Sequence, residues 1–335
     1  MIEYLKKVGA GKERAKNLTY EEAYNANTMI LKQEATDIQT GAFWSSMRMK
    51  QATEEELKGF IDSTAVYTEF IETELNPLDL AVPYDGKNRT IHILPASIFI
   101  ASGVGVNLVG HGSDKVPSKF GITYHEVLNE MGCNYIEDKN KLKKALELSG
   151  FAFYHQKYMN KKLYSLLPKR EEFGLRSYIN TIEKLLNPFK STKVIIGYTH
   201  KAFVERYIQI SYHRGFKDIY LINGLEGGIE PFISKPTQIK SNKAFSLNII
   251  AKEIDIDISL ESVDNSVKKN AEICLSILKN ENSPYKQWAL LTSAILVVTY
   301  GLVSDIKEAY NLCEHSLSEM AALEKFEIYK NISNS

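Results

Sequence analysis

The stretch Val106-Asn-Leu-Val-Gly-His-Gly-Ser-Asp-Lys-Val-Pro-Ser-Lys-Phe-Gly121 decides the fold class. Its apolar residues alternate up to a turn that carries His111 and Gly112, a pattern typical of a buried strand that ends in a loop. Ligands of open α/β sheets bind beyond the carboxyl ends of such strands. The loop offers hydroxyl and ammonium donors that suit an anion, on Ser113, Lys115, Ser118 and Lys119. The alternative is an ordinary strand-to-helix loop whose lysines are only solvated.

The chain around this stretch predicts further strands that alternate with helices. We expect strands at residues 90–93, 107–110, 193–198, 218–222 and 245–249. Helical periodicity marks residues 127–131, 140–148, 203–213, 267–278, 286–301 and 304–323. Strands separated by segments of this length indicate an α/β fold with a mainly parallel central sheet.

The first 75 residues predict a separate, small all-helical domain. Three capping boxes, in which a hydroxyl and a carboxylate or amide satisfy free backbone groups at a helix start, stand at Thr19-x-x-Glu22, Thr36-x-x-Gln39 and Thr53-x-x-Glu56. An amphipathic segment at about 170–190 is expected to return and complete this domain. Residues 76–169 and 191–330 then form the larger α/β domain.

The composition limits which binding partners and which cellular compartment we expect for the protein. Basic and acidic residues both number 41, so any nucleic-acid binding must come from local patches. Cys133, Cys274 and Cys313 lie far apart, which argues against a disulfide framework or a cysteine zinc site and fits a cytoplasmic protein. The apolar run at 289–303 includes polar residues and falls short of the roughly 20 residues of a membrane span, so we expect a buried helix and no membrane association.

One local patch of positive charge lies between residues 139 and 170. Its basic residues are interleaved with Phe151, Phe153, Tyr154, His155, Tyr158 and Tyr164. Such a mixture can follow phosphates while bases stack on the rings. The alternative for Lys141, Lys143 and Lys144 is the solvated face of one helix.

Several stretches together resemble the anthranilate phosphoribosyltransferases. Residues 8–23, 41–50 and 53–60 are similar to the helical domain of that family. The resemblance continues in order through His111-Gly112, Ser118-Lys119-x-Gly121, Arg170-Glu-Glu-Phe-Gly-Leu-Arg176, Asn187-Pro188 and Asn270-Ala-Glu-Ile. It implies a small α-domain hinged to an α/β domain, a homodimer formed through the small domain, and an active site in the interdomain cleft.

The chain departs from the family at the site for phosphoribosyl pyrophosphate (PRPP). The family's Gly-Thr-Gly-Gly-Asp loop cradles the pyrophosphate with bare backbone amides. Here the stretch reads Val82-Pro-Tyr-Asp-Gly-Lys-Asn-Arg-Thr90, in which Pro83 has no amide donor and Tyr84 fills space. The family's Asn-x-Ser-Thr group and the lysine before His-Gly are replaced by His92-Ile-Leu-Pro95 and Gly110.

The metal and acceptor positions also differ. The family's Asp-Glu pair for Mg²⁺ corresponds to Gly224–Glu230, which keeps Glu230 and Glu226 but has Ile229 at the aspartate. Arg176 matches the arginine that faces the carboxylate of anthranilate, whereas Asn160 replaces a histidine. The segment that begins at Arg176 looks more like a divergent paralogue branch of the family, for which nucleic-acid binding has been proposed.

Two functional hypotheses follow. The first is a protein that binds a phosphate-rich ligand, single-stranded nucleic acid or polyphosphate, in the interdomain cleft, beside a degenerate PRPP site. The alternative is a glycosyl- or phosphoribosyltransferase for an unidentified acidic aromatic acceptor, with Mg²⁺ held by Glu226 and Glu230. The candidate ligand-binding residues are Asp85, Gly86, Lys87, Arg89, His111, Gly112, Ser113, Lys115, Ser118, Lys119, Arg170 and Arg176.

Overall fold

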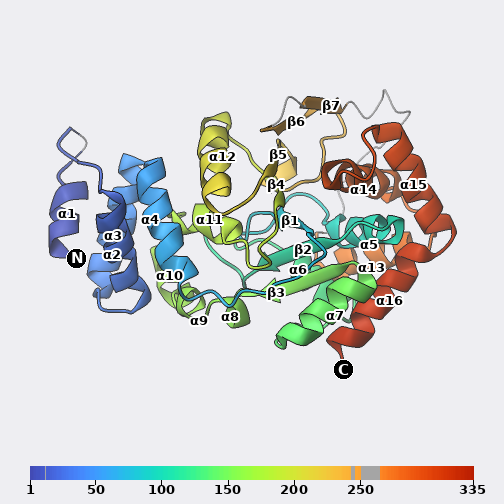
Figure 1. The fold of residues 1–335 in the computed structure, drawn as a ribbon, viewed down its shortest axis with the longest axis horizontal. Coiled ribbons are helices and arrows are strands. Elements are labelled where there is room, and N and C mark those ends of the chain that lie inside the picture. The colour runs from blue at the N-terminus through green and yellow to red at the C-terminus, as the bar shows by residue number, and fades with distance from the viewer. Residues whose placement is uncertain (12, 243–245, 250–264) are drawn as a thin grey trace.

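A helical bundle forms one end of the molecule in the computed structural model, which describes residues 1–11, 13–242, 246–249 and 265–335 (Figure 1). Its helices are α1 (Ile2–Val8), α2 (Tyr20–Leu31), α3 (Asp37–Lys50) and α4 (Glu54–Ala65). All three predicted capping boxes are present, at the starts of α2, α3 and α4. Helices α2 and α4 pack closely because Gly59 has no side chain: a Cβ there would lie 2.4 Å from the carbonyl oxygen of Tyr20.

The segment after residue 166 packs against this bundle. It contains α10 (Leu167–Phe173), α11 (Ile179–Ile182) and the short helix η1 (Glu183–Leu185). Tyr178 stacks on Phe60 with ring centroids 3.9 Å apart, and its hydroxyl donates to the Oδ1 atom of Asn27 at 2.8 Å. Trp44 meets Phe173 edge to face at 5.5 Å. The aromatic contacts therefore fix this segment on the helices, as the amphipathic pattern predicts.

Seven strands form one sheet within the described residues. They are β1 (Leu78–Ala81), β2 (Leu108–Gly112), β3 (Phe151–His155), β4 (Lys193–Gly197), β5 (Asp218–Ile222), β6 (Thr237–Ser241) and β7 (Ser246–Ile249). Their order is β3-β2-β1-β4-β5-β6-β7. The first five are parallel, and β6 and β7 are antiparallel additions at one edge. The mainly parallel α/β fold predicted from the sequence is confirmed.

The strand order reverses between β1 and β4, which are paired neighbours. From β1 the chain proceeds outward through β2 and β3, then returns to β4 and proceeds outward on the other side through β5. A crevice opens beyond the carboxyl ends of the strands at such a reversal, and ligands of open α/β sheets bind there. The topology thus directs the search for a ligand site to the region after Ala81 and Gly197.

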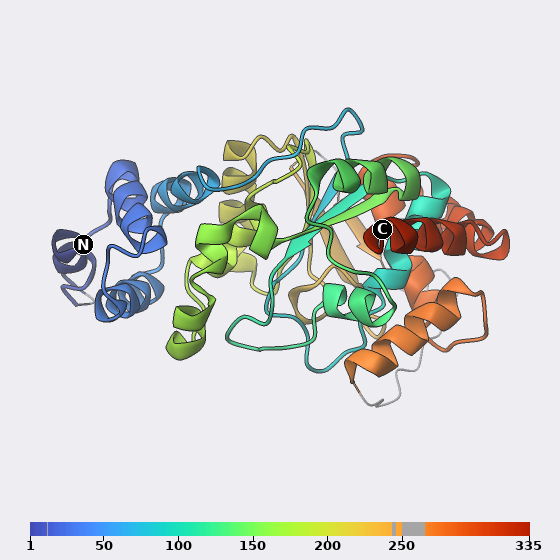
Figure 2. The same cartoon turned by 90° about the horizontal axis from the view of Figure 1, so that it is seen from below.

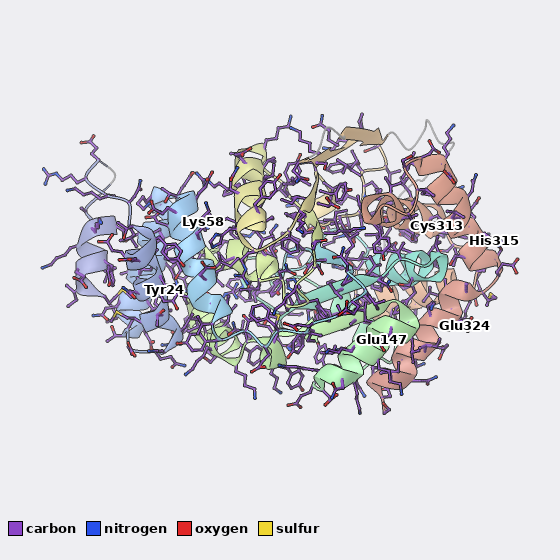
Figure 3. All side chains as sticks on the ribbon, viewed as in Figure 1. Tyr24, Lys58, Glu147, Cys313, His315 and Glu324 are labelled. Carbon is purple, nitrogen blue, oxygen red and sulfur yellow. The ribbon has the colours of Figure 1, made fainter. Side chains whose placement is uncertain are left out.

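The remaining helices enclose the sheet at the end opposite the bundle (Figures 1 and 2). They include α5 (Leu94–Val104), α6 (Tyr124–Glu130), α7 (Lys139–Ser149), α13 (Val267–Leu278), α14 (Lys286–Tyr300), α15 (Ile306–Ser318) and α16 (Ala321–Ser333). Helix α12 (Val204–His213) instead lies on the bundle side and contacts α4 (Figure 1). Helix α5 contacts α13, α14, α15 and α16, and both α5 and α14 are almost fully buried. Figure 3 shows Tyr24 and Lys58 on the bundle and His315 and Glu324 on the far helices.

The apolar run at 289–303 lies mostly in the buried helix α14, as expected. Among the described residues, no helix is both long enough and apolar enough to cross a membrane.

Two expectations about individual elements are wrong, and three strands were missed. Residues 90–93 form no strand, because side chains take up their backbone donors: Thr90 N–H donates to Glu226 and His92 N–H donates to Asn270. Strands β1, β3 and β6 were not predicted. The helix expected at 304–323 is two helices, α15 and α16, which meet at Met320 with a left-handed φ of 61°. Phe245, the first residue of another expected strand, lies outside the described residues.

Candidate functional site

A cleft of about 930 Å³ lies between the bundle and the sheet, at the reversal point of the strand order. The loop after β1 contributes Pro83 and Tyr84, and the turn after β4 contributes Tyr198 and Thr199. Residues at the end of α3, the start of α12 and the segment around Tyr178 close the remaining sides. The interdomain position predicted for the ligand site is therefore the position of this cleft.

Cationic side chains outnumber acidic ones in the lining of the cleft. Six cations contribute to its walls: Arg48, Arg89, Lys119, Arg176, Lys184 and Arg206. Only two acidic residues line it, Asp85 and Glu226. Among the described residues, no carboxylate pairs with Arg48, Arg89 or Arg206. The cleft thus has an excess of positive charge although the whole chain is neutral.

Asp85 is neutralised by the chain's own cations. The Nε of Arg176 donates to the Oδ2 of Asp85 at 2.9 Å, and Nη2 contacts the same oxygen. The ammonium group of Lys119 lies 3.9 Å from the other oxygen and donates to the carbonyl oxygens of Gly86 and Glu226. Arg176 was expected to face an acceptor's carboxylate. Its guanidinium instead binds Asp85 while its side chain, 40% exposed, still lines the cleft.

Glu226 fills a cluster of backbone amides. Its Oε1 atom accepts from the N–H groups of Arg89 and Thr90 at 2.9 and 3.0 Å, and its Oε2 accepts from Asn88 N–H at 3.0 Å. Burial favours the neutral acid, but the donors on Asn88, Arg89 and Thr90 outweigh it and lower the pKa of Glu226. Clustered N–H groups are a typical anion-binding arrangement. Here a side chain of the protein is the anion.

Lys87 and Glu230 form a buried ion pair in a small second pocket, which shares Pro83 and Glu226 with the cleft. Their side chains are only 4% and 1% exposed. The Nδ1 of His92 lies 3.9 Å from Glu230, and the Nε2 of His92 donates to the carbonyl oxygen of Ile122 at 2.6 Å. Burial, and then the charge of Lys87, lower the pKa of His92 well below its ordinary value. His92 is therefore neutral, and Lys87 is the cation that compensates Glu230.

The two glutamates do not fit a magnesium site in this arrangement. Glu226 binds backbone amides and Glu230 pairs with an ammonium group, so neither carboxylate is available as an oxygen ligand. The described part of the chain also has no group of three or more histidine, cysteine, aspartate or glutamate residues that could hold a metal ion. Lys87, expected among the phosphate ligands, is likewise engaged with Glu230.

Four further expected ligand residues are buried structural residues. His111 lies in β2, where its Nε2 donates to Asp79 at 3.2 Å and its Nδ1 contacts the hydroxyl of Tyr84. Gly112 and Ser113 are buried beside it. Arg170 is 2% exposed and binds both oxygens of Glu183, at 2.7 and 2.9 Å. These residues shape the wall behind the cleft and do not line it.

Of the remaining expected residues, Lys115, Ser118 and Gly86 also lie outside the cleft lining. Lys115 is exposed and lies 3.9 Å from Glu126, which fits the alternative of a solvated lysine. Gly86 has a φ of +69° and packs against Gly121, so it shapes the loop that carries Lys87. The structure therefore brings together Asp85, Arg89, Lys119, Arg176 and Glu226.

Most aromatic side chains of the basic segment at 139–170 are buried, whereas Tyr158 and Tyr164 are half-buried, and Tyr158 lines a separate pocket with Lys139, Lys161 and Lys162. Phe151, Phe153 and Tyr154 belong to β3 and are at most 2% exposed, so their rings are core. Lys141 and Lys144 are exposed on α7, in agreement with the solvated-face alternative.

Other cleft residues were not singled out from the sequence. They are Arg48, Lys184, Phe203, Arg206 and Tyr207. The last three follow β4 directly, on the short helix η2 (Lys201–Phe203) and the first turn of α12. The rule that ligands bind beyond strand ends points to this segment as well as to the loop after β2. His200, between β4 and η2, also lines the cleft.

Family models match both parts of the chain. The description "Glycosyl transferase family, helical bundle domain" matches residues 2–65, and "Glycosyl transferase family, a/b domain" matches residues 85–323. The chain belongs to this glycosyl transferase family. An uncharacterized protein of Aquifex aeolicus (strain VF5) is 34% identical over 311 residues, which cover 92% of this chain and 96% of that protein. An anthranilate phosphoribosyltransferase of the same organism is 27% identical over 326 residues, 95% of each chain.

Solved structures share the fold of this glycosyl transferase family member. The anthranilate phosphoribosyltransferase of Thermus thermophilus has a TM-score of 0.83 at 18% identity and covers 99% of both chains. The enzyme of Saccharomyces cerevisiae in complex with PRPP and Mg has a TM-score of 0.84 at 16% identity, and covers 99% of this chain and 97% of that one. The fold is therefore anthranilate phosphoribosyltransferase-like.

Proposed function

We propose that this protein binds a phosphate-rich ligand, single-stranded nucleic acid or polyphosphate, in the cleft between the bundle and the sheet. One observation carries the proposal: six cations line the cleft against two carboxylates, of which Asp85 engages Arg176 and Lys119, and Glu226 is bound by backbone amides. A cleft lined by one sign of charge with low-dielectric walls concentrates ligands of the opposite sign. Phosphodiester and polyphosphate chains carry the matching charge along their whole length.

The contacts around the cleft also support a degenerate PRPP site. The Saccharomyces cerevisiae relative was solved with PRPP and Mg. In this chain the carboxylate of Glu226 takes the amide donors of residues 88–90, and Lys87 stands against Glu230. The buried ring of Tyr84 fills further space in the same loop. PRPP needs free backbone amides and a divalent cation. To bind here it would have to displace the carboxylate of Glu226, the ammonium group of Lys87 and the ring of Tyr84.

The test is binding of a labelled single-stranded 15-mer, measured by fluorescence anisotropy. Arg89→Ala and Arg206→Ala each remove a cleft cation that no carboxylate of the described residues pairs with, so we expect weaker binding. Lys144→Ala is the matched control, since Lys144 is an exposed cation on α7 outside the cleft. Equal effects of all three variants, or no binding by the unmodified protein, would reject the proposal.

A transferase is the second candidate, because anthranilate phosphoribosyltransferases match nearly the whole chain. It would act on an acidic aromatic acceptor held near Arg176, and its catalysis would rest on positioning and charge stabilisation. Calorimetric titration with PRPP, with and without Mg²⁺, separates the candidates. Micromolar, magnesium-dependent binding favours the transferase, and absence of heat at millimolar PRPP favours the binding protein.

We also propose a homodimer formed through the helical bundle. Ile38 on α3 is 86% exposed and Ile2 on α1 is 60% exposed, and these two helices pack against each other. Exposed large apolar side chains on neighbouring helices are candidates for an association surface.

A further inference from the structure

Aromatic side chains form a row along one wall of the cleft. His200 follows β4, Phe203 ends η2 and Tyr207 lies in the first turn of α12, and all three line the cleft. The ring centroids of His200 and Phe203 are 6.5 Å apart, and those of Phe203 and Tyr207 are 6.3 Å apart. Phe203 and Tyr207 are half-buried, so part of each ring is accessible to a ligand.

A cation supports each of the last two rings. The guanidinium carbon of Arg206 lies 5.6 Å from the centroid of Phe203. The ammonium group of Lys184 lies 4.1 Å from the centroid of Tyr207 and is anchored by donating to the carbonyl oxygen of Gly197 at 2.9 Å. Cation–π contacts of this kind hold a ring in place and occupy one of its faces. The opposite face is then the one on which a flat ligand group can stack.

An unpartnered polar group lies in the same wall. Tyr198 is 2% exposed and lines the cleft, and its hydroxyl has no hydrogen-bond partner among the described residues. Buried hydroxyl groups in folded proteins are normally hydrogen-bonded. A hydroxyl can donate to a phosphate oxygen or bond to the edge of a base, so this group is suited to a ligand that carries both.

We infer that unpaired nucleobases stack on Phe203 and Tyr207 while the cleft cations hold the phosphates, so that the ligand is single-stranded nucleic acid and not inorganic polyphosphate. The inference rests on the proposed binding of phosphate-rich ligands in the cleft. Polyphosphate has no π face and gains nothing from the aromatic row. In a duplex the bases already stack on each other, so their faces are not available to side chains.

The experiment compares three probes with the same protein: a labelled dT 15-mer, an abasic 15-mer with the same phosphates, and inorganic polyphosphate as a competitor. The double variant Phe203→Leu/Tyr207→Leu removes the π faces and keeps apolar bulk. Tyr212→Leu is the control, because Tyr212 is exposed on the same helix and does not line the cleft. Circular dichroism checks that α12 is retained in both variants.

Stacking on an aromatic side chain is worth about 5- to 150-fold in affinity per base. The dT 15-mer should therefore bind at least about fivefold more tightly than the abasic probe, and the double variant should lose this preference without weakening abasic binding. Salt-sensitive binding of both probes with equal affinity would overturn the stacking inference and leave the anion cleft standing. Failure of both oligonucleotides and polyphosphate to bind would instead reject the proposed function itself.

Discussion

Lys87 and Glu230 form an ion pair that is almost completely removed from solvent, in a small pocket that shares Pro83 and Glu226 with the cleft. The pair comes from two distant segments, the loop after β1 and the loop between β5 and β6. It neutralises Glu230, one of the two carboxylates that the resemblance assigned to Mg²⁺. The pair is therefore charge-balanced without a bound ion, and it leaves the positive charge of the cleft walls unchanged.

Removal of one partner of this pair should destabilise the fold strongly. Lys87→Met leaves the buried carboxylate of Glu230 uncompensated, which costs about 3–5 kcal/mol. The double variant Lys87→Met/Glu230→Gln should recover much of this loss. Urea unfolding measures both changes. Lys190→Met is the control, because the pair of Lys190 with Glu72 is exposed and worth at most about 1 kcal/mol. A loss in Lys87→Met no larger than in the control would contradict the account.

Glu226 should weaken ligand binding in the unmodified protein. Its pKa is lowered, so it is a full negative charge in the cleft at neutral pH. Glu226→Gln removes the charge and keeps an oxygen for the amides of residues 88–90. The carboxylate repels the phosphates of the oligonucleotide by about 1 kcal/mol. We therefore expect Glu226→Gln to bind the oligonucleotide about fivefold more tightly. Glu147→Gln, on the exposed surface of α7 (Figure 3), should change nothing. Weaker binding by Glu226→Gln would show that the carboxylate serves the ligand.

Buried histidines should make the fold sensitive to acid. Burial lowers the pKa of His125 to about 3, whereas an unfolded chain titrates near ~6.5. Below that pH the unfolded state binds more protons than the folded state, so stability falls as the pH falls toward the folded pKa. His125→Phe keeps the stacking on Phe153. It should reduce the slope of the unfolding free energy against pH by about 1.4 kcal/mol per pH unit, between pH ~5.5 and pH ~4. Denaturant unfolding across this range gives the slope; equal slopes would contradict the prediction.

The proposed dimer should depend on the exposed apolar face of the bundle. Ile38→Glu places a charge on that face and should convert a dimer into a monomer, as measured by light scattering after size-exclusion chromatography. Leu148→Glu is the control, because Leu148 is also exposed but lies on α7, away from the bundle. A monomeric unmodified protein, or a variant that stays dimeric, would reject this interface.

Local patterns in the sequence predicted the elements whose determinants are local. The capping boxes at Thr19, Thr36 and Thr53 form because each needs only residues within one turn. The strand expected at 90–93 failed because its backbone donors bind Glu226 and Asn270, which are distant in sequence. Strand β3 was overlooked because its aromatic residues lie beside lysines, and the pattern did not show which rings are buried.

The position of the site was predictable, but most of its ligand residues were not. The rule for strand ends and the resemblance both place it between the domains, and Arg89, Lys119 and Arg176 do line the cleft. The engagement of Lys87, Arg170 and His111 by buried partners depends on tertiary contacts with Glu230, Glu183 and Asp79. The sequence shows that a residue is charged, but it does not show whether that residue forms an ion pair inside the folded protein.

The salt dependence of single-strand binding tests the central claim most directly. Each phosphate that a cation neutralises contributes about −0.7 to the slope of log affinity against log salt concentration for single strands. If the cleft cations hold the strand, the unmodified protein should give a slope of about −2 or steeper, and Arg89→Ala/Arg206→Ala should reduce its magnitude by about 1.4. Lys144→Ala should leave it unchanged. A slope near zero, or one reduced by Lys144→Ala and not by the cleft variant, would contradict the account.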